Sequence, residues 1–198
     1  MSLSRDSSIL SLKTLPDQAG ARAAIAAIFF ETARTGFESS EARAQFQQRW
    51  LGRYLDNCPD EAFVACDAQG RVVGYLVGCL EHPVGHPLFA DISYFDAFAE
   101  LMQTYPAHLH INITGAHRGQ GLGGKLVEAF ARHAAQAGVP GIHAVTGDGS
   151  RNNSFYSGCG FTPGARATWN GNAIVCFVRS LRGQGGSDWH LSQPGRVG

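Results

Sequence analysis

Hydrophobic positions along the chain recur with two periods, and these periods predict an order of helices and strands. Apolar residues at helical spacing predict helices over 17–36, 40–55 and 121–138, with a further helical pattern near 95–102. Pro16 and Asp17 form a helix start, and Gly138 followed by Pro140 forms a helix end. On the helix over 121–138, the spacing of four residues predicts a surface pair of Glu128 with Arg132. The stretches rich in Val, Ile, Leu and Tyr predict strands over 9–12, 61–66, 71–81, 108–114, 142–146 and 173–179.

The strand at 108–114 has strict alternation of aliphatic and polar residues. Its aliphatic residues, which we expect on one face of a sheet, are Leu109, Ile111 and Ile113. The polar residues of the opposite face are His108, His110 and Asn112.

A glycine-rich loop follows this strand and opens the next helix. It reads Arg118-Gly119-Gln120-Gly121-Leu122-Gly123-Gly124-Lys125, with four glycines in six residues. Glycines leave backbone N–H groups uncovered, and the helix directs the positive end of its dipole to the same place. The loop therefore predicts a phosphate or pyrophosphate site.

Three motifs compete for this loop. The P-loop pattern fails because Leu126 stands where a hydroxyl residue would ligate Mg²⁺. The dinucleotide pattern G-x-G-x-x-G fits locally, but Asp148 lies later than the spacing of about 20 residues expected for a ribose ligand. The third pattern, Arg/Gln-x-x-Gly-x-Gly/Ala, is met by Arg118, Gly121 and Gly123.

A second motif about 30 residues downstream favours the third pattern. The segment 152–161 reads NNSFYSGCGF, with a Phe-Tyr pair followed by Gly160-Phe161. The two motifs together resemble the acetyl-coenzyme A signatures of the GNAT superfamily of N-acetyltransferases. The segment 105–111 is similar to the GNAT branch that includes the acetyltransferase-like domain of O-GlcNAcase.

The resemblance implies an α+β fold, in which a mostly antiparallel mixed sheet contains one parallel βαβ unit and carries helices on both faces. It implies that a distortion at Thr114-Gly115 separates the strand at 108–114 from the strand at Ile142, leaving a slot for a thioester. We expect one GNAT domain over residues 1–182 and a flexible tail over 183–198.

The resemblance also implies a set of residues that bind coenzyme A. The loop would hold the pyrophosphate through backbone N–H groups, and the strand around Ile111 would offer main-chain groups to the pantetheine arm and the thioester oxygen. The implied cofactor-binding residues are Ile111, Ile113, Arg118, Gly119, Gln120, Gly121, Leu122, Gly123, Gly124, Asn152 and Phe155. The second motif departs from the family pattern at Gly149 and Asn152, which stand where asparagine and alanine are common.

Catalytic candidates follow from the same resemblance. Tyr156 occupies the position that in many GNAT enzymes protonates the departing thiolate, and a phenol with an ordinary pKa near 10 is protonated at neutral pH. His110, His108 and Glu81 are candidates for the base, with His110 near mid-strand. The interpretation of each as a structural residue stays open, as does a reaction without a dedicated base.

Composition limits the partners. In 198 residues, 16 basic residues balance 16 acidic ones, so no basic field predicts a nucleic acid or an anionic membrane. The five cysteines form no C-x-x-C pair, so we expect no metal, and the residues at the start do not resemble a signal peptide. We expect a cytoplasmic protein whose partners are acetyl-CoA and an amine acceptor; the sequence leaves a homodimer open.

Two alternatives to an active N-acetyltransferase remain at this point. One is a non-catalytic coenzyme A-binding module with the same fold, in which Tyr156 is structural. The other is a dinucleotide-binding protein that uses the G-x-G-x-x-G pattern. The acceptor cannot be identified from the sequence.

Overall fold

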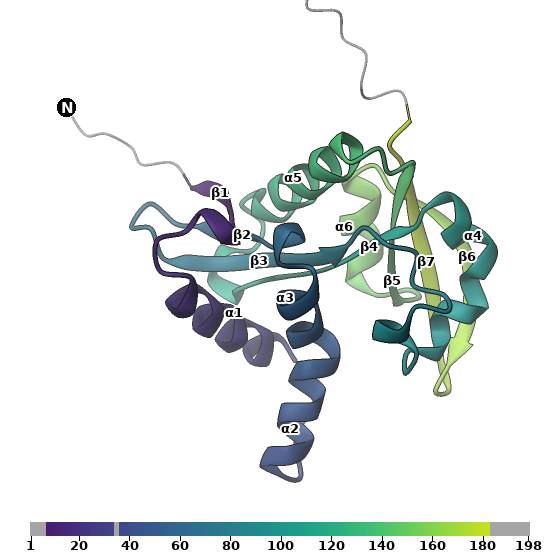
Figure 1. Cartoon of the computed structure of the whole chain (residues 1–198), viewed down its shortest axis with the longest axis horizontal. Helices are drawn as coiled ribbons and strands as arrows, with labels where there is room; N and C mark the ends of the chain where they lie inside the picture. The colour runs from purple at the N-terminus through teal and green to yellow at the C-terminus, as the bar shows by residue number, and fades with distance from the viewer. Residues whose placement is uncertain (1–6, 34–35, 183–198) are drawn as a thin grey trace, which may run out of the picture.

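A single sheet of seven strands organises the computed structural model, which describes residues 7–33 and 36–182 (Figure 1). The strands are β1 (Ser8–Ser11), β2 (Phe63–Cys66), β3 (Val72–Cys79), β4 (Ala107–Ile113), β5 (Gly141–Gly147), β6 (Thr162–Trp169) and β7 (Asn172–Ser180). Their order is β1-β2-β3-β4-β5-β7-β6, and only the pairing of β4 with β5 is parallel. The predicted α+β mixed sheet with one parallel unit is confirmed.

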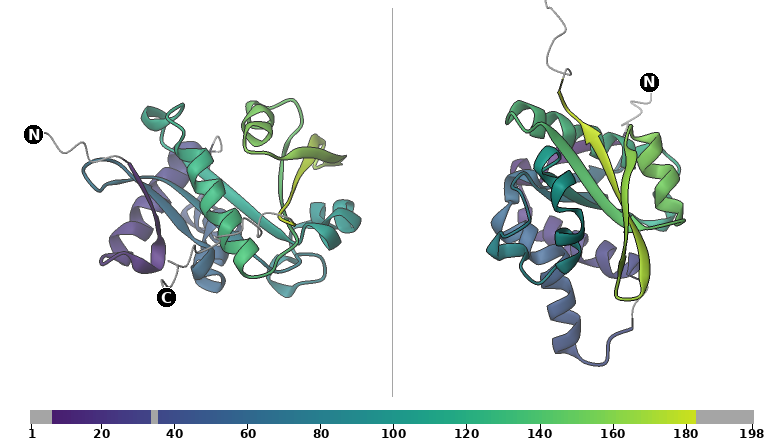
Figure 2. Two further views of the ribbon diagram at one scale, coloured as in Figure 1. Left: turned by 90° about the horizontal axis from the view of Figure 1, so that it is seen from above. Right: turned by 90° about the vertical axis from the view of Figure 1, so that its right-hand side faces the viewer.

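Helices cover both faces of the sheet (Figures 1 and 2). They are α1 (Gln18–Thr32), α2 (Ser40–Gln47), α3 (Arg53–Asn57), α4 (Ala99–Thr104), α5 (Leu122–Gln136) and α6 (Arg151–Gly158). On one face, α5 covers β2 to β5 and α6 lies against β5 and β6; on the other, α1 and α3 pack against β3. Helix α2 extends away from the sheet (Figure 1) and contains no buried residue.

Each face has its own hydrophobic core. The core beneath α5 combines alternate residues of the strands with the apolar stripe of that helix, which includes Leu126, Val127 and Phe130. The core on the opposite face contains Ile25 of α1 and Tyr54 of α3, together with the 3₁₀ helix η5 (Ser93–Phe98). The alternation predicted for 108–114 is confirmed, since Leu109 belongs to the α5 core while the His108 ring contacts the Tyr54 ring.

Local chemistry explains the helix boundaries. Asp17 accepts a hydrogen bond from the Gly20 N–H, which caps α1, and Ser39 caps α2 in the same way. The helix predicted over 40–55 is interrupted by a π-helical turn, η2 (Gln48–Gly52), that joins α2 to α3. The helical pattern near 95–102 corresponds to η5 followed by α4.

One predicted contact is wrong. A surface pair of Glu128 with Arg132, expected from their spacing of four residues, is replaced by an ion pair of Glu128 with Arg179 of β7, with nitrogen and oxygen 2.6 Å apart. The predicted tail from residue 183 lies outside the described residues. Within 7–33 and 36–182, no helix is long and apolar enough to cross a membrane.

Candidate active site

The two central strands separate soon after they meet. The β4–β5 register contains two residue pairs, Ala107 with Ile142 and His108 with His143, although β4 continues to Ile113. Beyond this point β4 stays paired with β3, and β5 stays paired with β7. In Figure 1, β5 and β7 accordingly run steeply across the direction of β3 and β4.

The separation is not located at Thr114-Gly115. It starts immediately after His108, and β4 keeps a continuous register with β3 up to Ile113. The gap therefore comes from the divergence of two regular strands rather than from a break at the end of β4.

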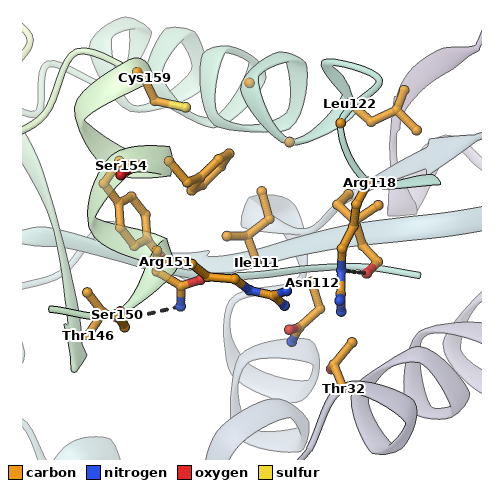
Figure 3. Close-up of a pocket in the computed structure, with 18 of the residues that line it drawn as sticks. Thr32, Ile111, Asn112, Arg118, Leu122, Thr146, Ser150, Arg151, Ser154 and Cys159 are labelled. Carbon is orange, nitrogen blue, oxygen red and sulfur yellow. Dashed lines mark hydrogen bonds between the residues drawn. The ribbon is translucent and has the colours of Figure 1, made fainter. Parts of the chain in front are cut away.

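A cavity of about 1100 Å³ opens at this divergence beside α5 and α6, and it also reaches Thr32 of α1 and Asn112 of β4 (Figure 3). The predicted site residues that line it are Ile111, Ile113, Arg118, Gly119, Gly121, Leu122, Gly123, Gly124, Asn152, Phe155 and Tyr156. Gln120 is not among the lining residues; its side-chain amide donates to the Ala116 carbonyl. The structure thus brings together the residues of two motifs that are about 30 positions apart.

The glycine loop exposes an uncapped helix start to this cavity. Gly119 and Gly121 have φ angles of 74° and 77°, a left-handed conformation that suits glycine. Gly121 is the N-cap of α5, and no side chain caps the helix. The first N–H groups of α5 therefore have no carbonyl partner within the helix. A phosphate fits this position, since it would accept from these groups at the positive end of the helix.

Close packing between α5 and α6 shapes the wall beside the loop. A Cβ atom at Gly123 would lie 2.8 Å from Cε2 of Phe155. A Cβ atom at Gly124 would meet nothing within 4 Å, which leaves open space at the first turn of the helix. The two adjacent glycines therefore do different things: one permits helix contact and the other keeps the wall open.

Basic side chains reach the cavity from two elements. In Figure 3, Arg118 approaches from the glycine loop and Arg151 from the start of α6. The Arg118 Nε–H donates to the Ile113 carbonyl at 3.1 Å, which holds this side chain across the end of β4. The local charge therefore suits an anionic ligand.

Tyr156 lines the cavity and packs between aromatic rings. Its side chain is buried and its ring contacts Phe155, Phe161 and Phe177. Burial raises the pKa of Tyr156 above its ordinary value, so the phenol keeps its proton at neutral pH. The structure thus places a protonated phenol at a cavity that also contains the helix start.

His110 lies on the opposite face of β4 and does not line the cavity. Its Nε2 atom is 3.1 Å from the Tyr54 hydroxyl, and its ring packs edge-on against Trp50. Burial, with a smaller contribution from Arg53, lowers the pKa of His110 to about 4. His110 is therefore neutral at pH 7.

The remaining base candidates are also outside the cavity. Glu81 follows β3, is exposed, and lies 2.8 Å from Nε2 of His86. His108 is buried, and neither of its ring nitrogens has a hydrogen-bond partner among the described residues. Its ring stacks on His143, with centroids 5.4 Å apart.

Several lining residues were not predicted as a coenzyme-binding set. They are Thr32, Asn112, His117, Thr146, Gly147, Ser150, Arg151, Ser154, Gly158 and Cys159. Thr146 lies near the end of β5 and Ser150 follows that strand, both at the end nearest the gap, so the strand order would have indicated them. Thr32 ends α1, and no local pattern connects it with a loop 86 to 92 residues later.

Comparisons with known proteins agree with this geometry. Residues 22–161 match the acetyltransferase (GNAT) family, and the chain belongs to that family. A search of curated proteins found no significant match.

Solved structures share the fold at low sequence identity. A structure of SsHAT has 23% identity and a TM-score of 0.69, covering 89% of this chain and 98% of that one. A mutant agmatine N-acetyltransferase in its apo form has 14% identity and a TM-score of 0.61, covering 88% and 99%. The NatC complex bound to Gag peptide and CoA contains a chain with 16% identity and a TM-score of 0.54, covering 88% and 98%.

Proposed function

We propose that this protein transfers the acetyl group of acetyl-CoA to a primary amine of a small molecule, peptide or protein. The observation that carries the proposal is the position of the uncapped start of α5 at one wall of the cavity that opens between β4 and β5. An anionic, elongated thioester suits such a cavity, because the helix start binds phosphate and the separated strand leaves main-chain groups free.

The chain's own groups would bind and orient this donor. The N–H groups at the start of α5, with Arg118 and Arg151, would hold the phosphates. Main-chain groups of β4 beyond His108 are no longer paired with β5, so those facing the gap would bind the amide-containing arm and the thioester oxygen. A fixed backbone donor at a developing oxyanion is typically worth about 3 kcal/mol.

Tyr156 would supply the proton that the leaving group needs. The amine nitrogen forms a bond to the acetyl carbon, the carbon–sulfur bond breaks, and the thiolate takes the phenolic proton. The amine releases its own proton to water, and Tyr156 regains one from solvent. Glu81 has no part in this scheme, since its carboxylate pairs with His86 away from the cavity.

A thermal-shift titration with acetyl-CoA, NADH and ATP·Mg²⁺ tests the cofactor. A ligand at about 100 times its dissociation constant adds roughly 2.7 kcal/mol to the free energy of unfolding. We expect stabilisation by acetyl-CoA alone. Stabilisation by NADH or ATP without acetyl-CoA would overturn the proposal.

Thiol release across a panel of primary amines tests the reaction, with Tyr156→Phe as the matched variant. We expect the variant to lose about a hundredfold in kcat, the typical contribution of a positioned acid, while its affinity for acetyl-CoA is unchanged. Unchanged kcat would remove the acid role from Tyr156. Binding of acetyl-CoA without turnover on any amine would favour a non-catalytic coenzyme A-binding module.

A further inference from the structure

The contact between Tyr54 and His110 joins two residues that are 56 positions apart and lies on the face of β4 opposite α5. Tyr54 belongs to α3 and is fully buried, whereas His110 is only partly buried. His110 is also the first residue of that face beyond the point where β4 and β5 stop pairing. The contact therefore fixes a histidine ring next to the gap.

The hydroxyl proton of Tyr54 has a single hydrogen-bond acceptor among the described residues. Among the described residues, the only hydrogen-bond partner of the Tyr54 hydroxyl is Nε2 of His110, at 3.1 Å. Burial raises the pKa of Tyr54 well above its ordinary value, so the hydroxyl keeps its proton. If Nε2 carried a proton and donated to the tyrosine oxygen, the buried O–H would have no acceptor. An unmet buried donor costs about 1–3 kcal/mol, so the arrangement in which Tyr54 donates is favoured.

The charged and titratable groups around His110 agree with a neutral ring. Arg53 of α3 lowers its pKa further, and the neighbouring histidines, His108 of β4 and His143 of β5, are themselves neutral at pH 7 because burial lowers their pKa values. A neutral imidazole carries one N–H. When Nε2 accepts from Tyr54, that N–H is on Nδ1.

Among the described residues, the Nδ1 atom of His110 is unpaired but not fully enclosed. It has no hydrogen-bond partner there, whereas the enclosed, unpaired nitrogen atoms of neighbouring rings are both nitrogens of His108 and Nε2 of His143. Nδ1, the ring nitrogen of His110 that is not enclosed by the protein, is therefore also the nitrogen that carries the proton.

We propose that Tyr54 is a positioning residue that fixes His110 as a neutral Nδ1–H donor, and that His110 uses this donor to bind an oxygen atom of the acceptor substrate. This inference rests on the proposed acetyl transfer. It changes the role of His110 from a base that takes the amine proton to a donor that orients the amine. The acceptor is then an amine that also carries a carbonyl, carboxylate or hydroxyl oxygen.

Long-range ¹H–¹⁵N correlation spectra of the histidine rings test the first part without any turnover. His110→Ala identifies the His110 signals. We expect the Nδ1–H form in the unmodified protein, and in Tyr54→Phe a shift toward the Nε2–H form. An Nε2–H form in the unmodified protein, or no change in Tyr54→Phe, would overturn the proposal.

Acceptor kinetics test the second part. Asn places an N–H donor near the position of Nδ1 but cannot act as a base, so His110→Asn is the matched variant for His110→Ala. We expect His110→Ala to raise the KM for an oxygen-bearing amine about tenfold, and His110→Asn to recover most of that loss at every pH from 6 to 9. Equal loss in both variants, with the acidic limb of the pH–rate profile removed, would identify His110 as a base and overturn the donor role.

Amines matched in length but lacking oxygen provide the control for the acceptor class. We expect their KM to be the same in the unmodified protein and His110→Ala; an equal tenfold change would contradict recognition of oxygen. If acetyl-CoA binds but no amine is acetylated, the proposed function fails, and the tautomer measurement still decides whether Tyr54 positions His110.

Discussion

The two faces of the sheet at β4 present different kinds of chemistry. On the α5 face, the cavity is formed by backbone N–H groups, glycines and two arginines around aliphatic residues of the strand. On the other face, aromatic and histidine side chains pack on one another, with Tyr54, Trp50 and Phe89 around His108 and His110. The α5 face thus presents mainly main-chain groups, and the other face presents side chains brought together by the fold.

In the function proposed above, this difference would separate binding of the acetyl donor from recognition of the acceptor. Main-chain recognition depends on loop shape and tolerates change in most side chains. Side-chain recognition depends on contacts between distant elements, such as α3 with β4. Variants on the two faces should therefore fail in different ways.

The largest effect is expected from a variant that disturbs the α5 face directly. A Cβ atom at Gly78 of β3 would lie 2.5 Å from Cε2 of Phe130 and 2.6 Å from the His108 carbonyl oxygen. Gly78→Val should lower the free energy of unfolding by about 3 kcal/mol, because backbone and helix must both move. Urea denaturation measures this. Gly36→Ala, where nothing lies within 4 Å, serves as the control and should be nearly neutral; equal stability of both variants would contradict close packing beneath α5.

The opposite face should respond to pH. Burial lowers the pKa of His143 to about 4, below its value of about 6.5 in the unfolded chain. Between pH 6.5 and 4 the unfolded state binds more protons, so the free energy of unfolding falls as pH falls. His143 should contribute on the order of 2 kcal/mol to this fall.

The matched comparison is His143→Gln, with stability measured by urea denaturation at each pH. Carboxylates titrate in both proteins, so the difference between the two curves isolates the histidine. We expect a shallower fall in the variant below pH 6.5; superimposable curves would show that His143 is not buried as a neutral group.

Charge at the helix start should separate binding from stability. Gly124 is the third residue of α5, where an acidic side chain favours the helix but repels phosphate. Gly124→Asp should leave the melting temperature of the ligand-free protein unchanged or higher and weaken acetyl-CoA binding about tenfold, equivalent to about 1.4 kcal/mol. Gly124→Ala controls for the added Cβ atom. Equal affinity of the Asp and Ala variants for acetyl-CoA, measured by calorimetry, would show that the phosphates do not bind at the start of α5.

The smallest effect concerns the ion pair at the edge of the α5 face. The Arg179 side chain is only 9% exposed and pairs with Glu128, which is 47% exposed. Glu128→Gln should lower the free energy of unfolding by about 1 kcal/mol, since Arg179 keeps its bond to the Cys159 carbonyl at 2.9 Å. Asp60→Asn, which breaks an ion pair with Lys13 in which both side chains are 55% exposed, should change it by less than about 0.5 kcal/mol. The opposite ranking in thermal or urea unfolding would contradict a contribution from burial.

The sequence predicted the main-chain features better than the contacts between side chains. The alternation at 108–114 and the glycine start of α5 are local patterns, and the structure contains both. The π-helical turn between α2 and α3 has no such pattern, because apolar residues at helical spacing continue through it. The Tyr54–His110 contact depends on how α3 meets β4, which no spacing within either segment specifies.

The Glu128 pairing has the same explanation. A spacing of four residues correctly placed Glu128 and Arg132 on neighbouring turns of α5, but Arg179 offers a buried guanidinium from β7. Because Arg179 is largely buried, leaving its charge unpaired would be costly, so the Glu128 carboxylate pairs with Arg179 rather than with Arg132.

The two-residue register between β4 and β5 has a mechanical consequence. The pairing between β4 and β5 is limited to two residue pairs. Four strands, β1 to β4, lie on one side of it, and three strands, β5 to β7, lie on the other. The two groups of strands are otherwise held together by the packing of α5 and by the cores on each face. A ligand bound in the gap would contact both groups of strands, so its binding would reduce their motion relative to one another and make the whole domain more rigid.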